Sequence, residues 1–143
     1  MKLIGDMESL FCTYNQALAL KELGFNEPCM KEYHNEISCN NSTNDENTNS
    51  DLFELYGEGV ITSPLKSQVF KWFRDEHNIV HTVYSNASGY IWELHYNKER
   101  GGTHICDSEE SGDCELSGMF TTYEGAESAC IDKLISLIKE KKS

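Results

Sequence analysis

The chain has 143 residues, the size of one typical domain, and 38% of them are hydrophobic, so a core can form without a stabilising metal or disulfide. Asp and Glu total 24 against 12 Lys and Arg, which gives a formal net charge of −12. Such a charge repels nucleic-acid phosphates and anionic lipids. It argues against direct binding to nucleic acid or membranes. The charge is typical of a protein that is simply soluble, and the alternative is an acidic face for a basic partner, including mimicry of nucleic acid.

The start of the chain shows no targeting signal. Asp6 and Glu8 interrupt the first eleven residues, where a secretory signal would need a continuous apolar stretch. No apolar run approaches the roughly 20 residues of a membrane helix. We therefore expect a cytoplasmic protein, in its own cell or in a host, whose six cysteines stay as thiols.

A first helix is predicted after a lead-in of residues 1–12. Thr13 and Gln16 form a capping box, in which each side chain bonds a backbone N–H that the helix leaves unpaired. Gly24 can adopt the left-handed conformation that closes a helix, and Phe25 would then fold back on the last turn.

Two strand-like segments follow, Cys29–Asn35 and Leu52–Tyr56, and we expect them to pair as a hairpin. The connection between them, residues 35–51, is rich in Asn and Ser and nearly free of apolar residues. A segment this polar is not suited to burial, so it is predicted to be a long mobile loop.

A second helix is predicted to begin at Ser63-Pro64, to run to about His77 and to end near Asn78. Serine is a favourable N-cap, and proline at the first helical position loses only a donor that has no partner there. The predicted buried stripe contains four residues: Leu65, Val69, Trp72 and Phe73.

A second hairpin is predicted from Ile79–Tyr84 and Tyr90–Tyr96, because both segments are β-branched or aromatic and a turn-forming link joins them. Strict alternation places four residues on one face of its second strand: Tyr90, Trp92, Leu94 and Tyr96. A further strand is expected at Gly102–Cys106.

The last helix is predicted from about Tyr123 to Lys139. Thr121 and Glu124 form a capping-box pair at its start, and lysines crowd its end, where positive charge complements the helix dipole. Apolar residues recur at helical spacing along it: Ala126, Cys130, Ile131, Leu134, Leu137 and Ile138.

Together these elements predict a single α+β domain over residues 1–143, in the approximate order α-β-β-α-β-β-(β)-α. The antiparallel strands would form one small sheet with the helices packed on one face. An acidic loop, residues 107–118, would precede the last helix. Because a short sheet leaves open edges, a homo-oligomer is a further expectation.

His104, Cys106 and Cys114 form a candidate metal site. His104 and Cys106 alternate along a strand and would share a face. Zinc sites usually contain tightly spaced ligand pairs, however, and this stretch has none. Ordinary thiols in a strand and a loop are the alternative, and no cofactor is predicted.

Nucleophilic catalysis needs a Cys or Ser beside a His and an orienting group. Cys130 lies on the apolar stripe of the last helix, and no other cysteine stands in a recognisable nucleophile motif. No catalytic residue is assigned, and the chain is predicted not to be an enzyme.

Tyr84, Trp92, His95 and Tyr96 form a candidate binding set. Aromatic residues on a strand are most often core. The alternative is that they reach an exposed sheet face and line a partner site, where Tyr and Trp contribute much of the binding energy. The sequence leaves both interpretations open.

Four segments, Gln16–Cys29, Ser63–Ile79, Gly89–Leu94 and Thr121–Glu140, resemble a group of short proteins from Bacteroidetes and from phages and prophages that infect them. The resemblance rests on helix caps, apolar stripes and the Ser-Pro and Tyr-Glu helix starts. It implies a small accessory protein of a phage or mobile element, and it implies no catalytic residues.

These observations predict a non-enzymatic binding protein that acts by protein–protein contact or by sequestering a host factor, for example to counter host defence. Two alternatives stay open. One is a small metal-dependent or Cys/His-dependent hydrolase that uses His104 and Cys106, and the other is a structural component of a virion.

Overall fold

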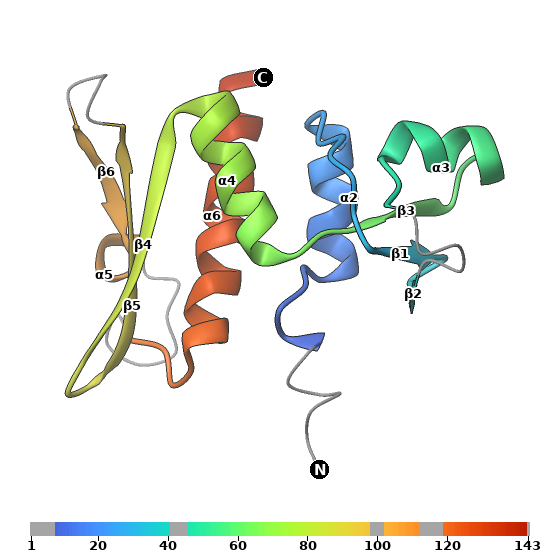
Figure 1. Ribbon diagram of the computed structural model, residues 1–143. Coiled ribbons are helices and arrows are strands. Elements are labelled where there is room, and N and C mark those ends of the chain that lie inside the picture. The colour runs from blue at the N-terminus through green and yellow to red at the C-terminus, as the bar shows by residue number, and fades with distance from the viewer. Residues whose placement is uncertain (1–7, 41–45, 98–101, 112–118, 143) are drawn as a thin grey trace, which may run out of the picture. The chain divides into compact units, whose positions relative to one another are not determined.

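A computed structural model describes residues 8–40, 46–97, 102–111 and 119–142 (Figure 1). The chain divides into two compact units, Met1–Leu65 with Ile138–Ser143, and Lys66–Leu137. Helices and antiparallel strands occur in both, which confirms the α+β class and, roughly, the predicted order of elements. The strands form two three-stranded sheets instead of one. The single domain expected from the length stays a prediction.

The first unit contains helices on both faces of its sheet. Its elements are α2 (Tyr14–Glu22), β1 (Lys31–His34), β2 (Ile37–Asn40), α3 (Asn49–Tyr56) and β3 (Val60–Ser63), with strand order β2-β1-β3. Ala17 of α2 packs with Tyr33 and Ile61 on one face. On the other face, Tyr56 of α3 contacts His34 edge-on, with ring centroids 5.3 Å apart.

The caps of α2 are those that the sequence predicts. The Thr13–Gln16 capping box is present, with Gln16 N–H donating to Thr13 Oγ1 over 3.2 Å. Gly24 has φ +103°, and Phe25 N–H donates to the Leu20 carbonyl over 2.9 Å, which folds Phe25 back into the core.

The segment between α2 and α4 differs from its prediction in two places. Leu52–Tyr56 belongs to a helix, α3, which begins with a Thr48–Asp51 capping box. Strand β2 lies inside the stretch predicted to be a loop, and it pairs with β1 across a two-residue turn. The predicted Asn-rich loop is therefore partly ordered, while residues 41–45 lie outside the described residues.

Ser63 also differs from its prediction, because it ends β3 and is not a helix cap. The residue before a proline is driven toward extended backbone, and Ser63 pairs with Lys31 of β1. Helix α4 (Lys66–His77) starts only after Pro64 and ends, as predicted, at Asn78, which has φ +57°.

The second unit is built on the sheet β4-β5-β6, formed by β4 (Ile79–Asn86), β5 (Gly89–Tyr96) and β6 (His104–Asp107). These ranges confirm the predicted hairpin and the further strand. A four-residue helix, α5 (Ser108–Ser111), lies within the predicted acidic loop, whose residues 112–118 are not described.

Helix α6 (Tyr123–Lys142) confirms the predicted last helix and its buried stripe, in which Cys130 has no exposed surface. The capping residue is one position later than predicted, because Thr122 Oγ1 accepts the Gly125 N–H over 3.0 Å.

Candidate functional site

The sheet of the second unit has a covered inner face and an outer face that is exposed along β4. On the inner face, Trp92 and Leu94 are fully buried, and Phe70 of α4 stacks on His81 with ring centroids 3.4 Å apart and planes 3° apart. Side chains alternate along a strand, so Thr82 and Tyr84 point to the outer face. Both are exposed, Tyr84 by 45%. The outer face is thus exposed along β4, whereas Ile91 of β5, on the same face, is only 4% exposed.

The four predicted binding residues are divided between the two faces. Tyr84 and His95 belong to the outer face, because their strand partners Ile91 and Val80 are on that face. Trp92 and Tyr96 belong to the inner face, where Trp92 is 0% exposed. Trp92 is therefore a core residue, and its expected binding role is wrong. Tyr84 is exposed, His95 and Tyr96 are partly exposed, and a binding role for these three stays a prediction.

The outer edge of β4 is open to pairing within the part of the chain that is described. On β5, Tyr90 bonds Phe120 through both its N–H and its carbonyl, and Trp92 N–H is directed at Ser108 Oγ, 3.4 Å away. These backbone groups point away from β4. In an antiparallel pair, the backbone groups of two directly opposite residues either bond each other or both point away. The backbone groups of Ser85 and Val83, which lie opposite Tyr90 and Trp92, therefore point away from β5.

The sequence of β4, IVHTVYSN, contains no charged residue and no proline. Edge strands in soluble proteins are usually protected by lysine, proline, a bulge or shortness, because unpaired backbone groups invite another strand. This eight-residue edge has none of these protections.

A β-bulge separates His104 from Cys106. Asp107 pairs with Glu93 and Cys106 with Leu94, but His104 pairs with His95, so one extra residue lies in β6. The bulge places His104 on the outer face and Cys106 on the inner face. The expectation that these two side chains share a face is therefore wrong, and Cys114 lies outside the described residues.

His104 instead lies among carboxylates. Its Nδ1 is 3.2 Å from Glu93 Oε2, and its Nε2 is 2.7 Å from Glu110 Oε1. Asp107 accepts the Glu110 N–H at Oδ1 over 2.8 Å. His104, Asp107 and Glu110 each offer a ligand atom within 4.8 Å of the other two. The Glu110 hydrogen bond, with the charge of Glu93, raises the pKa of His104.

The same carboxylates make the surface near Tyr84 acidic. Lost hydration raises the pKa of the Tyr84 phenol, and the charges of Glu93, Asp107 and Glu109 raise it further. In the sequence, His104, Asp107 and Glu110 recur at intervals of three residues. Only the bulge and the partner strand bring Glu93 to them.

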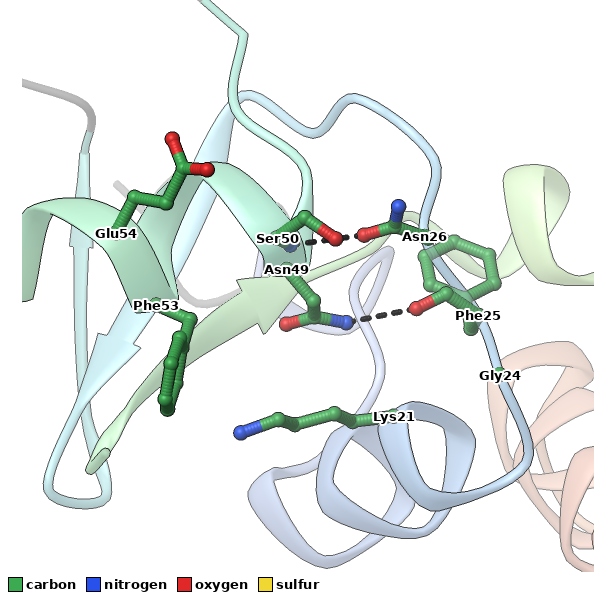
Figure 2. Close-up of a pocket in the computed structure, with 8 residues that line it drawn as sticks. All are labelled: Lys21, Gly24, Phe25, Asn26, Asn49, Ser50, Phe53 and Glu54. Carbon is green, nitrogen blue, oxygen red and sulfur yellow. Dashed lines mark hydrogen bonds between the residues drawn. The ribbon is translucent and has the colours of Figure 1, made fainter. Parts of the chain in front are cut away.

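The first unit has a hollow of about 540 Å³ between the end of α2 and the start of α3. In Figure 2 the Lys21 side chain extends toward the Phe53 ring, and Glu54 points away from it. The polar walls are occupied by structural bonds: Asn49 Nδ2 donates to the Phe25 carbonyl over 2.9 Å, and Asn26 Oδ1 accepts the Ser50 N–H over 2.8 Å. Those bonds hold the start of α3 against the segment that follows α2.

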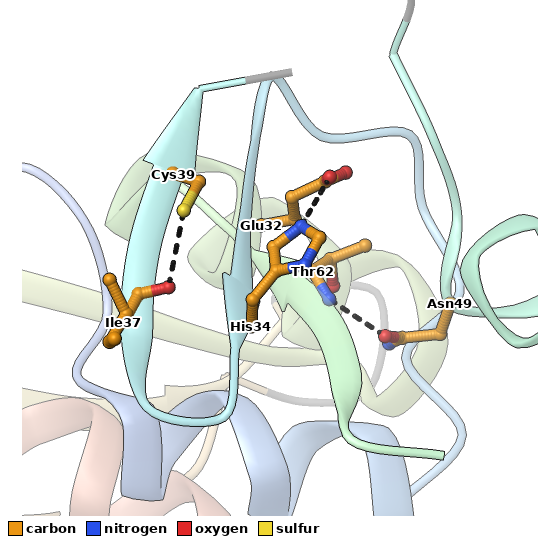
Figure 3. A network of polar contacts seen from close by, with 6 residues as sticks. All are labelled: Glu32, His34, Ile37, Cys39, Asn49 and Thr62. Atoms are coloured by element: carbon orange, nitrogen blue, oxygen red, sulfur yellow. Dashed lines mark hydrogen bonds and ion pairs between the residues drawn. The ribbon is translucent and has the colours of Figure 1, made fainter. Parts of the chain in front are cut away.

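A thiol, an imidazole and a carboxylate also occur on neighbouring strands of the first unit, as Figure 3 shows. His34 Nε2 lies 2.7 Å from the buried Glu32 Oε1. Cys39 Sγ is directed at the Ile37 carbonyl, 3.7 Å away, and not at the imidazole. A catalytic cysteine needs a base within hydrogen-bond reach, so this network does not form a catalytic triad.

No protein-family model, curated protein or solved structure matches this chain. Within the described ranges, no helix combines the length and the apolar character that a membrane span requires. The function must therefore be argued from the chain's own surfaces.

Proposed function

We propose that this chain is a non-enzymatic binding protein that acts by protein–protein contact along the outer edge and outer face of β4. The observation that carries the proposal is the eight-residue edge, which has no charge and no proline and whose alternate backbone groups point outward. Backbone groups of this kind bind an extended segment of a partner by adding it to the sheet, and the neighbouring side chains provide specificity.

The acidic surroundings indicate the chemistry of the partner. Glu93, Asp107 and Glu109 are near enough to Tyr84 to raise the pKa of its phenol. A strand added beside β4 would place every second side chain on the outer face of the sheet. Basic side chains at those positions would be attracted by the neighbouring carboxylates. The net charge of −12 strengthens the preference over longer distances. We infer a partner with an extended, basic segment, and the sequence resemblance adds the proposal that it is a host factor.

A second copy of the chain is the alternative occupant. Two β4 edges that pair antiparallel would join two sheets around a twofold axis. The two copies would also bring like charges together, which opposes such pairing in dilute salt. We therefore favour a basic partner, and a mass measurement separates the two cases.

A metal-dependent hydrolase is a second candidate function, because His104, Asp107 and Glu110 could together hold an ion. The thiols do not strengthen it, since Cys106 is on the opposite face from His104 and Cys39 is not directed at His34. The contact function, in contrast, needs only the strand edge and the side chains that the structure describes.

The test uses synthetic eight-residue peptides with alternating Val and Lys, and the matched Val and Glu peptide, titrated into the full chain. We expect the basic peptide to bind and the acidic one not to bind, with binding weakened by salt. Thr82→Lys, which adds charge to the exposed middle of the edge, should abolish binding. Ser67→Lys adds the same charge at an exposed residue of α4 and should leave binding unchanged.

Equal binding of both peptides, or binding that survives Thr82→Lys, would contradict the proposal. Light scattering on the same samples identifies a dimer. A dimer that Thr82→Lys dissociates would show that the second copy occupies the edge, which still supports a contact function.

A further inference from the structure

We propose that His104, Asp107 and Glu110 bind one divalent transition-metal ion, with zinc as the best-matched probe, and that Glu93 orients the imidazole. This inference goes beyond the contact function and does not depend on it. It also differs from the sequence expectation, because the ligands are carboxylates on the outer face and not the thiols of Cys106 and Cys114.

The first argument is the geometry. The three ligand atoms lie within 4.8 Å of one another. Around one zinc ion at ordinary bond lengths, ligand atoms are about 3.4 Å apart. The His104–Glu110 contact of 2.7 Å needs to open only slightly to admit an ion. The residues come from β6 and from α5, which follows it directly, so small side-chain rotations are enough.

The second argument is the orientation of the imidazole, which comes from outside the three ligands. A histidine that binds a metal usually donates its other ring N–H to a carboxylate, which fixes the tautomer and makes the ring a better ligand. Glu93 Oε2 on β5 lies 3.2 Å from Nδ1 and fills this place. Nε2 is then the ring nitrogen that would bind the ion, and it lies 2.7 Å from Glu110 Oε1.

The third argument is charge. Glu110 and Asp107 provide two negative charges, which match a divalent ion, and Glu93 and Glu109 add to the field. Asp107 uses Oδ1 to accept the Glu110 N–H, so its second oxygen is available. A mixed nitrogen and oxygen set suits zinc or manganese better than magnesium or calcium, which prefer oxygen alone.

The imidazole also gives the site a pH dependence. Only the neutral ring binds a metal, so protons compete with the ion for His104. Zinc binding should therefore weaken as the pH falls.

The experiment is calorimetric titration of zinc chloride into the reduced full chain. We expect one site per chain. His104→Gln and Glu110→Gln should remove the site, and Glu93→Gln should weaken it roughly tenfold. Glu109→Gln is the matched control, because it removes the neighbouring exposed carboxylate of α5 without removing a ligand.

Three results would overturn the proposal. One is no binding at millimolar zinc. Another is a site that survives both His104→Gln and Glu110→Gln. The third is a site that Cys106→Ser or Cys114→Ser removes, which would place the metal on the thiols. Circular dichroism of every variant separates loss of the site from loss of the fold.

Discussion

His81 should make this protein sensitive to mild acid. Its ring lies flat against Phe70 of α4, on the covered face of the sheet. Burial, reinforced by the charges of Arg74 and His95, lowers the pKa of His81 from 6.5 to about 4. The folded chain therefore holds His81 neutral under conditions in which the unfolded chain would protonate it.

The sign and size of the effect follow from this difference. The unfolded chain takes up a proton at His81 below about pH 6.5, whereas the folded chain takes it up only near pH 4. The free energy of unfolding is then undiminished above pH 6.5 and falls as the pH drops toward 4. Between pH 7 and pH 5 the free energy of unfolding should fall by about 1–2 kcal/mol. This figure is smaller than the full pKa difference would give, because the ring is partly exposed to solvent.

The perturbation is His81→Phe, which keeps an aromatic ring against Phe70 and removes the titration. The assay is urea unfolding followed by tryptophan fluorescence at pH 7 and pH 5. Carboxylates and the other histidines contribute equally to both proteins, so the difference between the two pH dependences isolates His81. We expect the variant to lose about 1–2 kcal/mol less than the parent chain. Identical pH dependences would refute the reasoning.

Two further pairs of substitutions test which contacts stabilise each unit. Asn49→Ala leaves two buried backbone partners unbonded and should lower the free energy of unfolding by about 2–4 kcal/mol, whereas Asn26→Ala, at an exposed residue, should cost less than about 1 kcal/mol. Gly89→Ala should be more destabilising than Gly24→Ala in the same urea assay. Both glycines have positive φ, but only at Gly89 would the new Cβ lie 2.6 Å from the Phe120 carbonyl. Equal losses within either pair would contradict these arguments.

The helices of this fold were largely predictable because their signals are local. The Thr13–Gln16 box, the apolar stripe of α4 and the stripe of α6 are read from residues within a few positions of one another. The β4–β5 hairpin was predictable for the same reason, since two β-rich segments flank a short turn.

The region around α3 shows where local signals were outweighed by composition. Thr48 and Asp51 are the capping pair of α3, but they lie in a run so rich in Asn and Ser that its composition predicts a loop. The β1–β2 turn was hidden for another reason. It uses Asn35 and Glu36 at φ 52° and 73°, and Glu rarely adopts the left-handed region.

The candidate surfaces depend on long-range pairing, which the sequence does not display. Alternation alone predicted that His104 and Cys106 would share a face, and a single extra residue in β6 separated them. The open edge of β4 likewise depends on which strands pair with β5. Tyr84 and His95 could be proposed from the sequence, whereas Glu93 could be added to His104 only after the register was known.

The central claim is that the β4 edge receives a partner strand, and amide hydrogen exchange measured residue by residue by NMR tests it most directly. In the free chain, Val83 and Ser85 should exchange fast, because their N–H groups point away from β5, while Thr82 and Tyr84 should be protected. Adding the basic peptide should protect Val83 and Ser85 in the parent chain and not in Thr82→Lys. If Val83 and Ser85 are already protected in the free monomer, or stay unprotected when the peptide is saturating, the edge is not the contact surface.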